Sequence, residues 1–462
     1  MGAARVGNKS ICLPVLSETA YETLVSNAPA FRRYLELWAN KQPEIFPPEM
    51  RAGFRFHDFV TSRKLGLRMR RIQLVETGEV YQLRPEFAMP YMVGRTDEVE
   101  KGLFLRRYGV QFDALAYVFG RDASYWYRIC QSLGRFSIVG ATVKNPKMIP
   151  ANLVSDEKHS WLLGERVYIP TTVASGCFLG VDIVESADTK ALVEGYKSFR
   201  TEVLTLNPDY HPETVNTDGW EHTQAAWQTL FPGIQIILCF LHAVLSIQKC
   251  CRRTLALLQK VTGRLWRVYK APTKREFSQR LRCLQEWAAA KVEPISVRQK
   301  LLNLRAKAAK FQVAYDFPDA YRTSNALDRL MNYQDRLLYN MQYFHGTKDS
   351  ARLQLRAMAL IWNFHPYGSR TKFNDPSRSS PFKDLNGFQY NDNWLHNLLI
   401  ASSMNGRRPG KQADHMHPLE PESFQVNCLP SHENSTLHHQ HRENRTDARK
   451  PGDLVGKISP RD

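Results

Sequence analysis

The stretch TVNTDGWEHTQAAWQTLFPGIQIILCFLH, from Thr214 to His242, decides the fold. Its first residues suit a short strand that ends at Thr217-Asp218-Gly219. The spacing of apolar residues predicts a helix over Glu221–Leu230, and Ile234–Phe240 has the near-continuous apolar pattern of a strand covered on both faces. An acid at the exit of a buried strand lies at the edge where α/β sheets bind ligands and metals. The alternative is that Asp218 is only a turn residue, because Asp-Gly is common in turns.

Composition points to a folded protein with a polyanionic partner. The chain has 462 residues, which leaves room for roughly three domains of ~150 residues each. Hydrophobic residues make up 43% and aromatic residues 11%, enough for real cores. The formal net charge of +18 favours nucleic acid as the partner, and the alternative is a basic protein with no such partner.

Cysteine usage and hydropathy bear on the compartment. The eight cysteines contain no CxxC pair, a pattern typical of reduced, cytosolic thiols. The longest apolar run, Ile234–Ile247, is interrupted by Gln235 and His242 and is too short to cross a bilayer. We therefore expect a cytoplasmic protein with no membrane partner, associated with the nucleoid if it binds DNA.

The first 148 residues divide into two expected regions. Residues 1–66 read as a mixed helical region, and residues 67–148 as a β-hairpin followed by a DNA-binding helix-turn-helix. The hairpin covers Arg68–Arg84 and turns at Glu76-Thr77-Gly78.

The helix-turn-helix is expected over Thr96–Ile129, with Thr96 as a helix cap and Gly120-Arg121-Asp122 as the break. The second helix would enter the major groove of DNA. Its expected DNA contacts are Arg121, Tyr125, Trp126 and Arg128. The alternative is a pair of helices in a core that binds nothing.

The rest of the chain has an α/β pattern interrupted by helices. Residues 149–248 show the order β-β-β-α-β-α-β, and residues 321–405 return to the same domain with a long amphipathic helix. Between them, residues 249–320 read as a basic, all-α insertion. Residues 406–462 are polar and rich in histidine, the composition of a disordered tail.

Three acids recur in places that suit one site. Asp156 lies in Ser155-Asp156-Glu157 at the expected end of the first strand, Asp218 ends the fourth strand, and Asp328 lies in the first turn of the long helix. Two-metal phosphoryl transfer needs carboxylates that converge from separate parts of a chain.

Three stretches together resemble the DDE/DDD-type transposases of insertion sequences, in the broad Mutator-like class. They are Ser155-Asp156-Glu157, then Asn216–Trp220 followed by Cys239-Phe240-Leu241-His242, and then Thr323–Arg329. The resemblance covers about residues 95–405. It implies a ribonuclease H-like mixed sheet, β-β-β-α-β-α-β-α, with an all-α insertion.

The resemblance also implies the activity, which is cutting transposon ends and joining the 3′-hydroxyl to target DNA. Asp156, Asp218 and Asp328 would be the catalytic residues and the ligands of two Mg²⁺ ions, with Mn²⁺ as a substitute. Supporting roles would fall to Cys239, His242 and Asn325. The implied partners are terminal inverted repeats, target DNA and further copies of the chain assembled on DNA.

Two positions depart from the family pattern or leave a choice. The family usually has Glu where this chain has Asp328, and Asp335 is the fallback third acid. At the first acid, the choice is between Asp156 and the adjacent Glu157, and Asp156 is favoured because the family's acid is the first of the pair. The alternative functions are a transposase-derived DNA-binding regulator that no longer cuts, and a ribonuclease H-like nuclease that cuts without joining.

Overall fold

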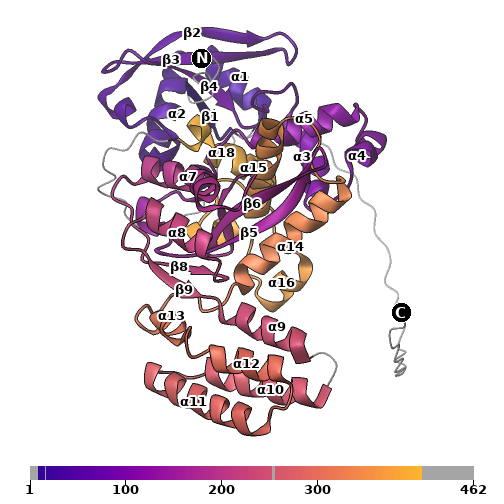
Figure 1. The fold of residues 1–462 in the computed structure, drawn as a ribbon. Helices are drawn as coiled ribbons and strands as arrows, with labels where there is room; N and C mark the ends of the chain where they lie inside the picture. Colours follow the sequence, from indigo (N-terminus) through magenta and orange to yellow (C-terminus); the bar gives the residue numbers. More distant parts are fainter. Residues whose placement is uncertain (1–8, 16, 252–254, 408–462) are drawn as a thin grey trace, which may run out of the picture. The chain divides into compact units, whose positions relative to one another are not determined.

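In the computed structural model, residues 9–15, 17–251 and 255–407 are described, and their strands form two sheets (Figure 1). The first sheet has the order β1-β4-β3-β2. The expected hairpin is confirmed, because β3 (Leu67–Leu74) pairs antiparallel with β4 (Val80–Pro85). β2 (Phe54–Ser62) pairs antiparallel with β3, and β1 (Ser10–Leu13) pairs parallel with β4.

This first sheet crosses the boundary that the sequence suggested at residue 66. Two strands, β1 and β2, come from the region expected to be helical. The helices of that region are α1 (Glu18–Ser26) and α2 (Ala28–Lys41), separated by Asn27, with short 3₁₀ turns at Pro43–Ile45 and Pro48–Ala52. The bulge in β2 between Phe56 and Phe59 interrupts its alternation, which hides the strand in the sequence.

The expected helix-turn-helix region contains α3 (Thr96–Arg106), α4 (Phe112–Phe119) and α5 (Ala123–Leu133). Thr96 is the first helical residue and not the cap, and its hydroxyl donates to the carbonyl of Glu86 at 2.6 Å. Asp122 caps α5 by accepting from the amide of Tyr125. A short helix α6 (Ile138–Thr142) and a 3₁₀ turn (Pro146–Met148) lead to the second sheet.

The second sheet has the order β7-β6-β5-β8-β9. Its strands are β5 (Asn152–Leu162), β6 (Glu165–Ala174), β7 (Cys177–Val181), β8 (Thr214–Thr217) and β9 (Gln235–Leu238). The first three are antiparallel neighbours joined by two-residue turns, and both turns use positive φ angles, as in Ser175-Gly176. The last two run parallel to β5, connected through α7 (Thr189–Leu206) and α8 (Glu221–Leu230).

The expected order of these elements is confirmed, with one shorter strand. β9 ends at Leu238, and α9 (Phe240–Cys251) begins within the stretch expected to continue the strand. The helical insertion therefore starts at Phe240. It continues with α10 (Leu255–Tyr269), α11 (Lys274–Lys291), α12 (Ile295–Asn303), α13 (Ala308–Gln312) and a 3₁₀ turn (Val313–Tyr315).

The insertion has an apolar core of its own, which reaches the second sheet through Leu238 and Phe240. The chain then returns in α14 (Asn325–Asn340) and α15 (Lys348–Phe364). Three further helices and a turn complete the described residues: α16 (Ser369–Asn374), α17 (Pro381–Asn386), α18 (Trp394–Ala401) and Ser403–Gly406.

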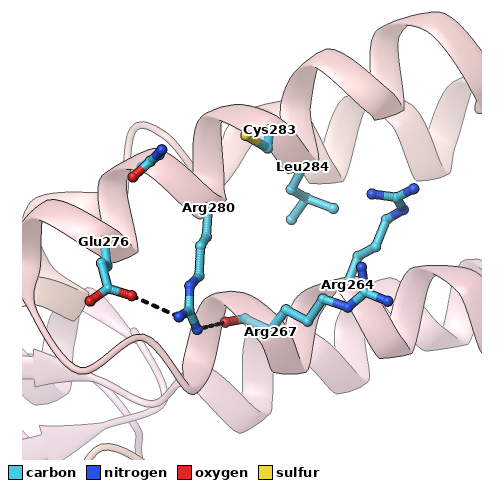
Figure 2. A pocket seen from close by; sticks show the side chains of 7 residues that line it. Arg264, Arg267, Glu276, Arg280, Cys283 and Leu284 are labelled. Carbon is cyan, nitrogen blue, oxygen red and sulfur yellow. Dashed lines mark hydrogen bonds and ion pairs between the residues drawn. The ribbon is translucent and has the colours of Figure 1, made fainter.

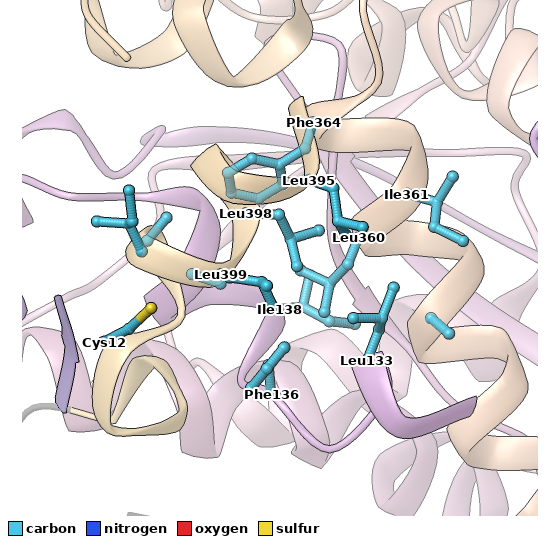
Figure 3. Packing of buried hydrophobic residues seen from close by; sticks show 14 of the residues in the cluster. Cys12, Leu133, Phe136, Ile138, Leu360, Ile361, Phe364, Leu395, Leu398 and Leu399 are labelled. Carbon is cyan, nitrogen blue, oxygen red and sulfur yellow. The ribbon is translucent and has the colours of Figure 1, made fainter. Parts of the chain in front are cut away.

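The largest core joins both ends of the described chain. Side chains of α5, α6, α15 and α18 pack around Phe136, and Cys12 of β1 reaches the same cluster (Figure 3). The amide of Cys12 donates to Ser403 Oγ at 3.0 Å, and that hydroxyl donates to the carbonyl of Ile45 at 2.6 Å. The N-terminal sheet therefore depends on residues near 400.

No helix in the described part of the chain has both the length and the apolar content to cross a membrane. The polar tail expected after residue 406 lies almost wholly outside the described residues.

Candidate active site

Asp156 and Asp218 come level with each other on neighbouring strands. The last pair of the parallel β5–β8 ladder joins Val154 to Asn216, so each aspartate lies two residues beyond that pair. β8 ends at Thr217, whereas β5 continues to Leu162. Asp156 therefore lies within its strand, not at the strand end that the sequence suggested. It lies where β8 has ended, at the carboxyl end of the parallel strands.

Asp218 also serves as a turn residue. Its Oδ1 accepts from the amide of Trp220 at 2.8 Å, and Gly219 after it has φ of +105°. The turn interpretation of the sequence thus holds locally without excluding a second role, because the carboxylate has a second oxygen.

Asp328 reaches the site because the start of α14 is tied to the end of the sheet. The amide of Phe240 donates to the carbonyl of Arg322 at 3.2 Å, and the amide of Ser324 donates to the thiol sulfur of Cys239 at 3.2 Å. The Ser324 hydroxyl in turn lies 3.4 Å from Asp328 Oδ1. Cys239 therefore helps to position the helix that carries the third acid.

Asp156 is influenced by the charges of the two other acids. The pKa of Asp156 rises to about 6, chiefly because the side chain is buried and then because of the charges of Asp218 and Asp328. Burial also raises the pKa of Asp328. The burial of Asp156 and the influence of Asp218 and Asp328 on it are compatible with the expected grouping of the three aspartates, which stays a prediction.

His242 lies beside Asp156. Its Nε2 lies 3.9 Å from Asp156 Oδ2. The pKa of His242 rises to about 9, first because of the Cys239 side chain and then because of Asp156 and Asp218. Among the described residues, the buried Nδ1 has no hydrogen-bond partner of ordinary geometry. His242 therefore carries a proton at neutral pH and partly offsets the acids.

Glu157 turns to the opposite face of the sheet, as strand alternation requires. Its Oε1 accepts from the hydroxyls of Tyr196 at 2.6 Å and Thr223 at 2.7 Å. Burial raises its pKa to about 7. Through these contacts Glu157 connects β5 to α7 and α8. Asp156, and not Glu157, is therefore on the face of the sheet that carries the candidate site.

Asp335 is engaged elsewhere on α14. Its carboxylate forms an ion pair with Lys158, which lies two residues after Asp156 on β5. α14 therefore runs along β5, with Asp328 near Asp156 and Asp335 near Lys158. Of the two candidates for the third acid, Asp328 is the one that interacts with Asp156.

A cleft of about 310 Å³ leads from Asp218 and His242 towards the insertion. Two lysines of the insertion, Lys300 and Lys307, line it, and Lys300 donates to the hydroxyl of Ser246 at 2.8 Å. Lysines next to a carboxylate cluster suit the phosphodiester backbone of a nucleic acid, because they can bind its phosphates while metal ions occupy the carboxylates.

The donor set fits a hard divalent cation in its chemistry, because carboxylate oxygens are the ligands that Mg²⁺ prefers. Burial and mutual repulsion at Asp156 also favour a nearby positive charge. As the side chains stand, however, no three His, Cys, Asp or Glu residues in the described ranges are gathered closely enough to hold a metal ion. The side chains of the three acids are not arranged as the ligands of a single metal ion.

A second basic cavity, of about 520 Å³, lies between α10 and α11 and shares no residue with the carboxylate cluster (Figure 2). Arg264, Arg267 and Arg280 line it. Arg280 is partly neutralised by Glu276 at 2.7 Å and donates to the carbonyl of Arg267. The whole segment 249–320 holds seventeen lysines and arginines against five acids, twelve of the eighteen surplus charges.

The residues of the helix-turn-helix that were expected to contact DNA differ in how exposed they are. Trp126 is only 2% exposed and its indole donates to the carbonyl of Gly120, so it belongs to the core and is not available to DNA. Tyr125 is half-buried and donates to the carbonyl of Val93. Arg121 and Arg128 are exposed, although Arg128 donates to the carbonyl of Ser124 on its own helix.

Some contributors to the site were missed in the sequence. Ser324 contacts the sulfur of Cys239, Asn216 ties β8 to the carbonyl of Tyr321 at 2.9 Å, and Lys300 lines the cleft. Asn325, expected as a supporting residue, is exposed at the first position of α14.

A scan against protein-family models found no match to this chain, and a search among curated proteins found no similar sequence.

Proposed function

We propose that this chain is a DNA transposase of the DDE/DDD type, built on a ribonuclease H-like sheet, which cuts element ends and joins the 3′-hydroxyl to target DNA. The strand order β7-β6-β5-β8-β9, with three antiparallel strands followed by two parallel ones, supports the sheet assignment. The observation that carries the activity is that Asp156 and Asp218 come level on neighbouring strands, while the contact between Ser324 and Cys239 ties the start of α14, which carries Asp328, to the end of β9.

Each residue would contribute in its own way. Asp156, Asp218 and Asp328 would hold the Mg²⁺ ions, with Mn²⁺ as a substitute. Two bound cations supply charge stabilisation for the attacking and leaving oxygens of an in-line displacement. His242 holds a proton that it can donate to a phosphate oxygen, and Lys300 and Lys307 would orient the strand that enters the cleft.

The basic insertion supports DNA as the substrate, since its surplus charge adjoins the carboxylate cluster through the cleft. Assembly of several copies on paired DNA ends belongs to the same proposal, as does a cytoplasmic, nucleoid-associated location.

The test is a cleavage assay with Mg²⁺ and labelled duplexes that carry the inverted repeats flanking the gene. Asp156→Asn, Asp218→Asn and Asp328→Asn should each lose at least ~10²-fold in cleavage while still binding DNA. Asp335→Asn is the matched control, because it removes the same group from the same helix but leaves the cluster intact, and it should cut normally. Undiminished cleavage by Asp218→Asn would rule out this site.

A regulator that binds DNA without cutting is the second candidate. The observation in its favour is that the acids of the described residues are not closed into a metal-binding group. A regulator would bind the same duplexes and leave them intact at any Mg²⁺ or Mn²⁺ concentration. A nuclease of other purpose would cut them and yield no joined product.

A further inference from the structure

Arginine and phenylalanine side chains interleave on one face of the N-terminal sheet. The guanidinium of Arg70 lies 4.2 Å from the ring centre of Phe56 and 4.5 Å from that of Phe59. Arg68 covers the same Phe59 ring at 4.3 Å, and Arg32 of α2 covers Phe54 at 4.5 Å. The bulge in β2 makes this possible, because it turns Phe59 to the same side as Phe56.

Arg68 and Arg70 lack a counter-charge. Among the described residues, no carboxylate forms an ion pair with either one. The Nε of Arg70 is buried and has no hydrogen-bond partner. Burial and then the charge of Arg68 lower the pKa of Arg70, so the two cations repel each other as they stand. An anion between the two guanidinium groups would relieve this repulsion.

The neighbouring Arg71 shows what a satisfied arginine looks like on the same strand. Its guanidinium donates to both carboxylate oxygens of Asp58. Arg71 therefore needs no external anion, whereas Arg68 and Arg70 remain open to one.

We propose that Arg68 and Arg70 form a binding site for the phosphodiester backbone of double-stranded DNA, on the face of β3 stacked against Phe56 and Phe59. Guanidinium groups are the donors best suited to phosphate oxygens. Stacking fixes them, so little side-chain freedom is lost on binding. Exposed Arg63 and Lys64, in the turn from β2 into β3, extend the positive charge next to this site.

The arrangement favours a duplex over a single strand. Single-stranded nucleic acids bind by stacking bases on free aromatic faces. Here the phenyl faces are already covered by guanidinium groups, which leaves charge and not ring surface to the ligand. Contacts of this kind carry no sequence information, so binding should be independent of base sequence.

This inference shares its partner with the proposed function but does not use the aspartates. Binding is therefore measured on the full chain in EDTA, where no strand is cut, by fluorescence anisotropy with a duplex of random sequence over a range of salt concentrations. Arg68→Gln and Arg70→Gln should each weaken binding about tenfold and lower the slope of log affinity against log salt by about 0.9.

Arg71→Gln is the matched control, because it removes one charge from the same strand at a position already neutralised by Asp58. It should change affinity less than twofold. Phe59→Leu keeps both charges and removes the ring beneath them, so binding should weaken while the salt slope stays constant. Thermal unfolding of each variant checks that the fold persists.

An unchanged salt slope in folded Arg68→Gln overturns the proposal, as does an equal loss in Arg71→Gln. Double-stranded RNA and vesicles with acidic lipids serve as further probes. If the two substitutions weaken binding to either of these and leave duplex DNA unaffected, the site belongs to that ligand and the DNA proposal fails. Loss of cleavage with normal duplex binding would concern only the aspartates.

Discussion

The Asp156 side chain is buried beside two other acids, and its pKa rises to about 6. A carboxylate whose pKa is higher in the folded than in the unfolded state favours folding only while it is protonated. That contribution is complete below the ordinary value of about 3.9 and is lost as the pH rises through about 6. At neutral pH without metal, Asp156 therefore destabilises the fold.

Replacing this carboxylate should make the protein more stable in EDTA. Asp156→Asn should raise the free energy of unfolding by about 3 kcal/mol at pH 7.5 and by only about 1 kcal/mol at pH 4.5. Urea unfolding at the two pH values measures both. Asp335→Asn should give no gain at either pH, because it leaves Lys158 without its partner. A pH-independent gain in Asp156→Asn would contradict the electrostatic explanation.

At the scale of elements, Gly134, which follows the last residue of α5, lies against the backbone of α15. Gly134 has helical φ and ψ angles, so alanine would suit its backbone, but a Cβ there would lie 1.9 Å from the carbonyl oxygen of Leu353. The backbones of these two segments can approach only because the position lacks a side chain.

Gly134→Ala should therefore force α15 away from α5 and cost roughly 1–3 kcal/mol of stability. Gly263→Ala in α10 is the matched control, because a Cβ there meets nothing within 4 Å and a glycine within a helix costs about 1 kcal/mol relative to alanine. The two substitutions should shift the midpoint of thermal unfolding in opposite directions. A neutral Gly134→Ala would mean that α15 moves freely.

The elements that the sequence predicted well are those whose pattern is local. Helix α8 begins and ends at the predicted residues, because Glu221 and Leu230 lie between a turn and a Phe-Pro-Gly break. β2 was missed, since its bulge disturbs the alternation that identifies a strand. The burial of Trp126 depends on α3 and α5 packing together, which no spacing within one helix reveals.

The candidate site was predictable to a similar degree. Asp218 follows a recognisable strand and Asp156 belongs to another, and the parallel pairing of the two strands then makes the aspartates level. The choice between Asp328 and Asp335 needed the direction of α14 over β5, which the contact of Asp335 with Lys158 supplies. The link between Cys239 and Ser324 spans 85 positions and has no local signature.

For the whole molecule, the last described helix supports the first strand. α18 packs in the core that contains Cys12, and Ser403 and Asn405 both accept backbone hydrogen bonds from earlier segments, at Cys12 and Ser137. The N-terminal sheet therefore shares its core and a hydrogen bond with these residues.

A chain that stops after Asn393 should therefore lose the N-terminal sheet, whereas one that stops after Arg407 should keep it. Near-ultraviolet circular dichroism should report the lost packing of aromatic rings. Trypsin should cleave rapidly within residues 9–90 of the shorter chain only, since that region is rich in arginine. Equal resistance of the two chains would contradict the dependence.

The hydrogen bond between Cys12 and Ser403 joins residues 391 positions apart. A ribosome that adds 5–20 residues each second needs on the order of 20–80 s to make that distance. During this interval the nascent strand β1 emerges with its apolar side chains uncovered, so the early part of the chain has to be shielded by chaperones or remain without its final packing until synthesis is nearly over.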